Sequence, residues 1–142
     1  MSMRTPAIVP VLLLEVAFAG CACQVETARF IHAAPGTEWV RTELAFGLGL
    51  SGGRTIEPAE WQSFLDEVVT PRFPDGLTVV DAHGRWRNAA GRMTAEPSKI
   101  LILFHPPDPA ASARIEEIRE LCKKRFGQES VLRATSPAKT SF

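Results

Sequence analysis

Charged residues in two separate stretches of the chain are suited to proton chemistry or to holding an anion. Glu43 lies in one stretch of alternating polar and apolar residues, and Glu96 and Lys99 lie in another. If these stretches are neighbouring strands, cross-strand pairing brings the carboxylates and the ammonium group together on one sheet face. A buried cluster of this kind has shifted pKa values and can transfer protons or grip an anion. The alternative is a structural ion-pair network at an interface.

A second candidate is the loop from Thr70 to Gly76, which reads Thr-Pro-Arg-Phe-Pro-Asp-Gly. Its two prolines fix φ and remove two backbone donors, so a preceding helix must end here. The Asp-Gly pair favours a turn. Arg72 and Asp75 are therefore held in a stiff loop, which suits either a binding loop or an ordinary helix-to-strand connection in which the two residues brace the loop. The candidate binding residues are thus Glu43, Arg72, Asp75, Glu96 and Lys99.

Metal-dependent and nucleophilic chemistry find little support in the sequence. Asp81 and His83 are two residues apart, but no second histidine is near in sequence, so we expect no metal and no cofactor. The cysteines at positions 21 and 23 are separated by one residue and form no Cys-x-x-Cys pair. The chain has no Gly-x-Ser-x-Gly elbow, so nucleophilic hydrolysis is unsupported and no catalytic residue is assigned.

The composition argues against nucleic acid as a partner. The chain has 142 residues, of which 45% are hydrophobic, enough for one domain with a core. Its sixteen basic and sixteen acidic residues cancel, and no basic stripe is present. The run from Lys123 to Arg125 falls in the last turn of a predicted helix, where cations complement the helix dipole.

Residues 1–20 resemble an export signal. Arg4 supplies a positive start, and the apolar run over 7–19 is too short to span a bilayer as a permanent anchor. The Phe-Ala-Gly-Cys stretch that ends at Cys21 resembles a bacterial lipobox. This resemblance implies that Cys21 is lipidated and holds the protein on a bacterial membrane, facing the periplasm. Cleavage without lipidation is the alternative, and it leaves a soluble periplasmic protein.

Hydrophobic periodicity predicts two helices and four strands after a flexible tether over 21–36. Alternation over 39–48 predicts a strand with one apolar face. Pro58 at a first helical position, followed by apolar residues at helical spacing, predicts a helix over 58–69. The other predicted elements are strands over 77–88, 93–104 and 130–135, a helix from Pro109 capped by Asp108 and ended by Gly127, and a frayed tail.

This order of elements is the ferredoxin-like βαββαβ plan of an α+β protein. Right-handed crossovers place both helices on one face of a four-stranded antiparallel sheet, within a domain over 37–136. The stretch from Ile100 to Phe104 is apolar at every position, so the other sheet face also needs a cover. We expect a homodimer packed sheet to sheet. The tether and an apolar ligand are the alternatives.

Six stretches of the chain form a recognisable set. They are Thr42-Glu43-Leu44-x-Phe46-Gly47-Leu48, Trp61-x-x-Phe64-Leu65, the run from Thr70 to Val79, Gly84-x-Trp86-Arg87, Glu96-x-Ser98-Lys99 and Phe126-x-Gln128-Glu129-Ser130-Val131. Together they resemble a bacterial family of exported proteins and lipoproteins, domain of unknown function 3574. The resemblance covers 37–135 and implies an envelope location. It brings no activity, cofactor or catalytic residue.

Two functions remain open on the sequence. The first is a dimeric, non-catalytic binding or assembly module tethered to a membrane. The second is a small-molecule-binding protein or small enzyme with Glu43, Arg72, Glu96 and Lys99 around a pocket on the open sheet face. A closed, dry face between two copies favours the first function, and a cavity lined by these charged groups favours the second.

Overall fold

The computed structural model describes residues 35–87 and 90–141. The predicted export signal, the lipidation site at Cys21 and all but the last two residues of the predicted tether lie outside these ranges. None of the helices in the described ranges has the length and apolar character that a membrane crossing requires.

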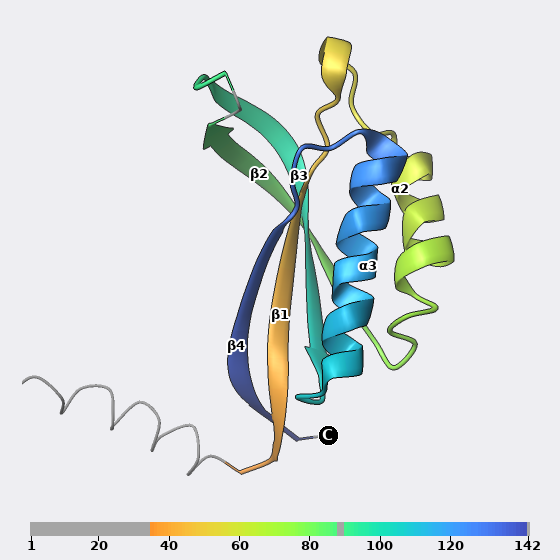
Figure 1. The fold of residues 1–142 in the computed structure, drawn as a ribbon, viewed down its shortest axis with the longest axis vertical. Helices are drawn as coiled ribbons and strands as arrows, with labels where there is room; N and C mark the ends of the chain where they lie inside the picture. The colour runs from red at the N-terminus through yellow and green to blue at the C-terminus, as the bar shows by residue number, and fades with distance from the viewer. Residues whose placement is uncertain (1–34, 88–89, 142) are drawn as a thin grey trace, which may run out of the picture.

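Four strands form one antiparallel sheet in the order β2-β3-β1-β4, and two helices pack on one of its faces (Figure 1). The predicted ferredoxin-like α+β fold is therefore confirmed. β1 is central, with Thr42 opposite Leu103 of β3 on one side and opposite Thr135 of β4 on the other. The elements are β1 (Thr37–Gly47), α2 (Pro58–Phe64), β2 (Thr78–Arg87), β3 (Met93–His105), α3 (Pro109–Phe126) and β4 (Leu132–Thr140), with a 3-10 turn over Ser51–Gly53.

Both helices begin and end at sequence signals. At the start of α2, the Glu57 backbone N–H donates to the Glu60 carboxylate at 2.9 Å, which satisfies a donor that has no partner inside the helix. At the start of α3, the Asp108 carboxylate accepts from the Ala111 N–H at 2.6 Å. Gly127 then ends α3 in the left-handed region, with φ of 66°.

The first helix differs from its prediction in one respect. After Phe64 the chain continues as a π-helical turn over Leu65–Val69, in which the Thr70 N–H donates to the Leu65 carbonyl at 2.8 Å. The chain then enters the proline-containing loop, where the Arg72 N–H donates to the Val69 carbonyl at 3.0 Å. The helical region thus ends at the residues that the sequence indicates, with a wider last turn.

The core lies between the helices and the sheet. Phe46 of β1 packs edge-to-face on Trp61 and Phe64 of α2, with ring centroids 5.2 and 6.2 Å away. Ile115 and Ile118 close it from α3 and are fully buried. Because α2 and α3 direct these apolar residues at one sheet face, that face holds the large buried side chains.

The prediction of a short last strand and a frayed tail was wrong. β4 continues to Thr140, which lies opposite Thr37 at the start of β1. Pro137 sits within this strand. The strand tolerates it because β4 is at the edge of the sheet, where a position whose donor side faces solvent loses no ladder hydrogen bond.

The other sheet face, called the open face below, carries apolar side chains that no helix of the described chain covers (Figure 1). Register places Val80 of β2, Ile100 of β3 and Ala45 of β1 in one row across this face. Val80 is 43% exposed, as is Phe104, and Leu132 on β4 is 66% exposed. The open face is therefore a strip of hydrocarbon bordered by polar groups.

Candidate functional site

A pocket of about 290 Å³ opens on the open face, where the β2–β3 hairpin extends past the helices. All four strands and the segment between α3 and β4 contribute to its wall. The residues that matter for its chemistry are Gly47, Trp86, Glu96, Ser98, Gln128 and Leu132.

Glu96 is held in this pocket by one hydrogen bond to each carboxylate oxygen. One oxygen accepts from the Gly49 backbone N–H at 2.8 Å, and the other accepts from the Trp86 indole N–H at 2.7 Å. A Cβ at Gly47 would lie 2.5 Å from the carboxylate, and one at Gly49 would lie 2.4 Å from it. The two glycines are therefore needed because the Glu96 carboxylate approaches the backbone so closely.

Strand register explains why these groups converge. Gly84 lies opposite Glu96 in the β2–β3 pair, and Gly47 lies opposite Ser98 in the β1–β3 pair. Opposed residues share a face, so all four positions belong to the open face. Gln128 completes the wall by donating to the Gly49 carbonyl at 2.9 Å, which ties the loop after β1 to the end of α3.

The charge of Glu96 is not neutralised within the described chain. Its hydrogen-bond donors are a backbone amide and an indole, and no lysine or arginine of residues 35–87 and 90–141 forms an ion pair with it. Hydrocarbon from Ile100 and Leu132 lines the opposite part of the pocket. A half-buried carboxylate beside an indole and apolar walls is suited to a small organic cation or to a hydrogen-bond donor with a hydrocarbon body.

Glu43 and Lys99 do not join Glu96. Glu43 is on the open face as expected, but it lies opposite Ile102 and forms an ion pair with Arg41 at 2.6 Å. Lys99 has the opposite parity from Glu43 and forms an ion pair with Asp81 on β2. The expected cross-strand cluster of Glu43, Glu96 and Lys99 is therefore not formed, because the observed register separates its members.

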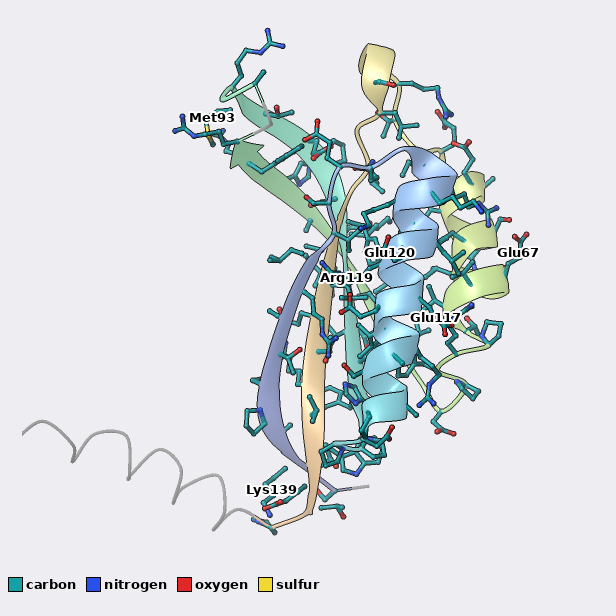
Figure 2. The ribbon with its side chains drawn as sticks, in the orientation of Figure 1. Glu67, Met93, Glu117, Arg119, Glu120 and Lys139 are labelled. Atoms are coloured by element: carbon teal, nitrogen blue, oxygen red, sulfur yellow. The ribbon has the colours of Figure 1, made fainter. Side chains whose placement is uncertain are left out.

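Arg72 and Asp75 lie at the far end of the sheet, where Arg72 braces the loop. The Arg72 guanidinium donates from Nε to Glu117 at 3.0 Å and from Nη1 to the Val68 carbonyl at 2.7 Å. Glu117 lies on the side of α3 that faces α2 and its following loop (Figure 2). Arg72 therefore ties the loop to the second helix. Asp75 is exposed, and both residues line a different pocket of about 340 Å³.

The sequence reading had missed most of the Glu96 pocket. Glu96 is among the candidate residues that the sequence indicates, whereas Gly49, Ser98 and Gln128 are not. A signal was available, because Gly47, Ser98 and Gln128 all lie in the stretches that carry the family resemblance. The stretches themselves do not reveal the strand register that brings three of them together.

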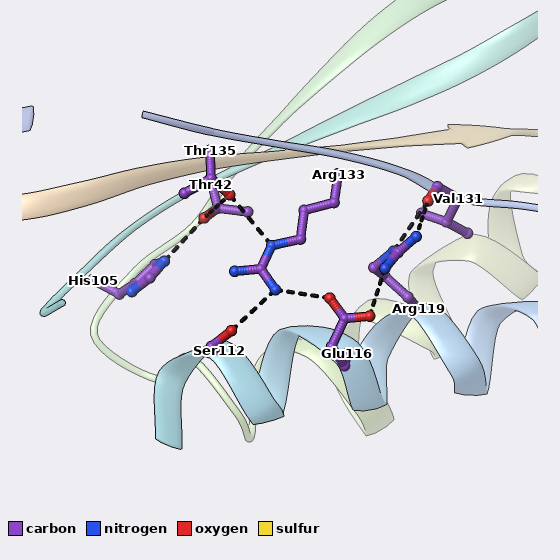
Figure 3. A network of polar contacts seen from close by, with 8 residues as sticks. All are labelled: Thr42, His105, Ser112, Glu116, Arg119, Val131, Arg133 and Thr135. Atoms are coloured by element: carbon purple, nitrogen blue, oxygen red, sulfur yellow. Dashed lines mark hydrogen bonds and ion pairs between the residues drawn. The ribbon is translucent and has the colours of Figure 1, made fainter. Parts of the chain in front are cut away.

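A separate polar network on the helix side fastens α3 to β4 (Figure 3). Arg133 of β4 donates to Glu116 at 2.7 Å and to Ser112 at 3.1 Å. Arg119 donates to Glu116 and, at 2.8 Å, to the Val131 carbonyl. The hydrogen bond from Arg133, followed by that from Arg119, lowers the pKa of the Glu116 carboxyl, although partial burial opposes this shift.

The network continues to a buried histidine (Figure 3). His105 Nδ1 lies 2.8 Å from the Pro106 carbonyl, which can only accept, so Nδ1 carries the proton. Nε2 lies 3.0 Å from the Thr42 hydroxyl, within hydrogen-bond distance. The Thr42 hydroxyl also lies 3.3 Å from that of Thr135. The hydrogen bonds of His105 and Thr42 thus join the three strands β3, β1 and β4.

Metal ligands and thiols are two further kinds of reactive group in the described residues. No three of the described histidine, cysteine, aspartate and glutamate residues are placed to hold a metal ion. Cys122 is a free thiol in the core, and burial raises its pKa from 9.0 to about 12. It is therefore a packing residue in the native state.

The fold matches that of a known structure at low sequence identity. A phage SAM lyase in its apo state superposes with a TM-score of 0.58 at 14% identity, over 76% of this chain and 89% of that chain. The same enzyme in complex with S-methyl-5'-thioadenosine gives 0.57 at 14%, over 72% and 82%. At this identity the likeness establishes the α+β fold alone. No curated protein sequence matches the chain.

The family is established by sequence. The model for "Protein of unknown function (DUF3574)" matches residues 41–142. This range includes all of the described strands and helices except the first four residues of β1. The chain belongs to this family, as its six motif stretches predict.

Proposed function

We propose that this chain is a homodimeric, non-catalytic binding module of the bacterial envelope, with the open face as the contact between two copies. The observation that carries this proposal is the exposure of Val80, Phe104 and Leu132 on one face. Exposed apolar patches of this kind mark interaction surfaces, and their burial is favourable by about 25 cal/mol per Å².

A second copy suits this face in charge and in size. The chain is formally neutral, and the Arg41–Glu43 ion pair on the face is neutral in itself. The unpaired Glu96 carboxylate lies toward the hairpin end of the face, where the Gly49 and Trp86 N–H groups donate to it. Four strands at a spacing of about 4.8 Å and a length of roughly 25 Å present about 500 Å² of sheet. That is less than the roughly 800 Å² per partner of a standard interface, so we expect a reversible dimer.

Sedimentation of matched variants tests the dimer. Leu132→Glu places a charge in the proposed contact, and Met93→Glu places the same charge at the hairpin end, where Met93 is 62% exposed (Figure 2). We expect the wild type and Met93→Glu to show a concentration-dependent dimer and Leu132→Glu to sediment as a monomer, all with the same circular dichroism. A monomeric wild type, or equal effects of the two charges, would contradict the proposal.

The envelope location depends on Cys21 and has its own test. Lipidation attaches an acyl chain to this thiol, so the wild type expressed in bacteria is expected to incorporate labelled palmitate and to fractionate with membranes. Cys21→Ser should lose the label, and Cys23→Ser should keep it. Label retained in Cys21→Ser would show that the anchor is elsewhere, and a wild type without label would leave cleavage alone as the processing step.

A second candidate function, binding of a small molecule by each copy, is favoured by the Glu96 pocket. A fixed carboxylate that the described chain leaves without a cation needs a ligand with a positive charge or a strong donor. Isothermal titration with small aliphatic and aromatic amines tests it. We expect binding that Glu96→Gln weakens and that Glu43→Gln, on the same face, leaves unchanged. If Glu96→Gln and Glu43→Gln bind the amines equally, or if the wild type binds none of them, this candidate function is wrong.

A further inference from the structure

We propose that a second pocket, beside the loop over 70–76, binds a small oxyanion through Arg114. The pocket has a volume of about 340 Å³ and lies where β1 and α3 begin and β3 ends. In Figure 1 this is the opposite end of the sheet from the Glu96 pocket. Apart from Phe104, which also belongs to the open face, the inference concerns different residues from the proposed function, and its test does not require the dimer.

The loop forms a rigid wall of this pocket. The N–H groups of Arg72 and Phe73 both donate to the Val69 carbonyl, at 3.0 and 3.1 Å. Pro71 and Pro74 restrict the remaining backbone freedom. Phe73 is 7% exposed, and its ring lies against His105 at the end of β3, with ring centroids 6.1 Å apart. A wall that is already ordered costs a ligand little conformational entropy on binding.

Arg114 of α3 supplies the positive charge. Its guanidinium carbon lies 5.4 Å from the centroid of the Phe73 ring, so the group stacks on the loop. Its Nε is buried without a hydrogen-bond partner, and no carboxylate of the described chain forms an ion pair with it. A planar guanidinium that the chain leaves unneutralised fits the paired oxygens of a carboxylate or phosphate.

The other charged residues around the pocket determine how tightly an anion binds there. The charge of Arg72 is already engaged by Glu117 at 3.0 Å, so it adds little. Asp75 lines the same pocket, is exposed, and opposes an anion. The electrostatic attraction of an anion to this pocket therefore depends on Arg114, which attracts it, and on Asp75, which repels it. Removal of the Asp75 charge is expected to strengthen anion binding.

Apolar side chains suggest what the anion carries. Trp39 and Phe104 line the pocket together with Pro106. Phe104 is 43% exposed, so part of its ring is available to a ligand. A carboxylate with an aromatic or aliphatic body fills such a pocket better than a bare ion. We therefore expect organic acids to bind more tightly than acetate or inorganic phosphate.

An NMR titration of the full chain with benzoate, acetate and inorganic phosphate tests the site. Binding is expected to shift the Trp39 indole and Gly76 amide signals, with benzoate the tightest of the three. Arg114→Gln should weaken binding by about tenfold or more, as expected for loss of a charge-assisted bidentate pair. Lys124→Gln, which removes an exposed cation from the same helix, should change nothing. Asp75→Asn should bind more tightly than the wild type.

The outcomes separate clearly. Shifts that vanish in Arg114→Gln support the site, and the tightest probe then tells a carboxylate ligand from a phosphorylated one. Should Arg114→Gln unfold, Arg114→Lys keeps the charge without the planar fork and is expected to bind with intermediate affinity. The proposal fails if none of the three anions shifts either signal. It also fails if Arg114→Gln binds as the wild type does, or if Asp75→Asn binds more weakly than the wild type.

Discussion

Trp86 and Glu96 are joined across the β2–β3 hairpin by a hydrogen bond of 2.7 Å from the indole Nε1 to the carboxylate. The second oxygen of the same carboxylate accepts from the Gly49 N–H. One side chain thus fastens the hairpin to the loop that follows β1. The hairpin extends beyond the helices. This link therefore holds the hairpin end of the open face, and the Glu96 pocket in it, in position.

Gly47→Ala is expected to destabilise the fold by about 1–3 kcal/mol, the cost of losing a hydrogen bond to a charged group. The new Cβ would lie 2.5 Å from Glu96 Oε1, so the carboxylate must leave its donors. Urea denaturation measures the change. Gly84→Ala is the matched control, since its Cβ would meet Ser98 Oγ at 3.5 Å, an ordinary contact.

The same substitution in a Glu96→Ala background checks the cause. With the carboxylate absent, Gly47→Ala is expected to cost little, and the two changes are therefore non-additive. An undiminished cost in that background would mean that backbone strain, and not the approach of Glu96, requires glycine at this position.

Stability is expected to fall at acid pH through Glu116. The Arg133 and Arg119 guanidinium groups hold its folded-state pKa below the ordinary value of 4.5. A carboxyl with a depressed folded pKa contributes stability above its unfolded pKa, and that contribution is lost as pH falls through the folded pKa. The stability difference between wild type and Glu116→Gln should therefore shrink below about pH 4.5. A difference that stays constant from pH 7 to pH 3 would contradict the ion-pair assignment.

Cys122 is expected to resist alkylation in the native protein. Its pKa is raised to about 12 by burial, so almost no thiolate is present at pH 8, and the core excludes the reagent. Iodoacetamide treatment followed by peptide mass spectrometry reports this residue separately from Cys21 and Cys23. Labelling should be complete in urea and absent in buffer, and native labelling at the rate of a free thiol would show that α3 opens readily.

Thr42→Val is expected to cost about 1–3 kcal/mol, because it keeps the volume of a fully buried side chain and leaves His105 Nε2 without its hydrogen-bond partner. Thr135→Val is the comparison, since that hydroxyl is in an exposed residue and its contact with Thr42 is longer, at 3.3 Å. Thermal unfolding of the two variants should separate them. Equal losses would indicate that the strand contacts, and not the histidine, carry the effect.

Much of the fold was predictable because its signals are local. The cap at Asp108, the left-handed Gly127 and the alternation of β1 each depend on a few neighbouring residues. β4 was underestimated because Pro137 normally argues against a strand, and only its place at the sheet edge makes it acceptable. Edge position is a property of the assembled sheet, which local sequence does not contain.

The candidate site was harder to predict for a related reason. Of the five residues chosen from the sequence, only Glu96 lies in the open-face pocket. Glu43 and Lys99 were expected beside it, but strand register decides which residues face each other, and register is set by long-range pairing. The role of Gly49 also depends on a carboxylate 47 residues away. Such a contact leaves no pattern within either stretch.

The account depends most on a second copy covering the open face. Isotope-filtered NMR on an equal mixture of labelled and unlabelled chains measures contacts between copies directly. We predict intermolecular NOEs from the methyl groups of Val80, Ile100 and Leu132 at concentrations where the dimer is populated. A dimer whose intermolecular NOEs arise from α2 or α3 instead, or a sample with no such NOEs at millimolar concentration, would contradict it.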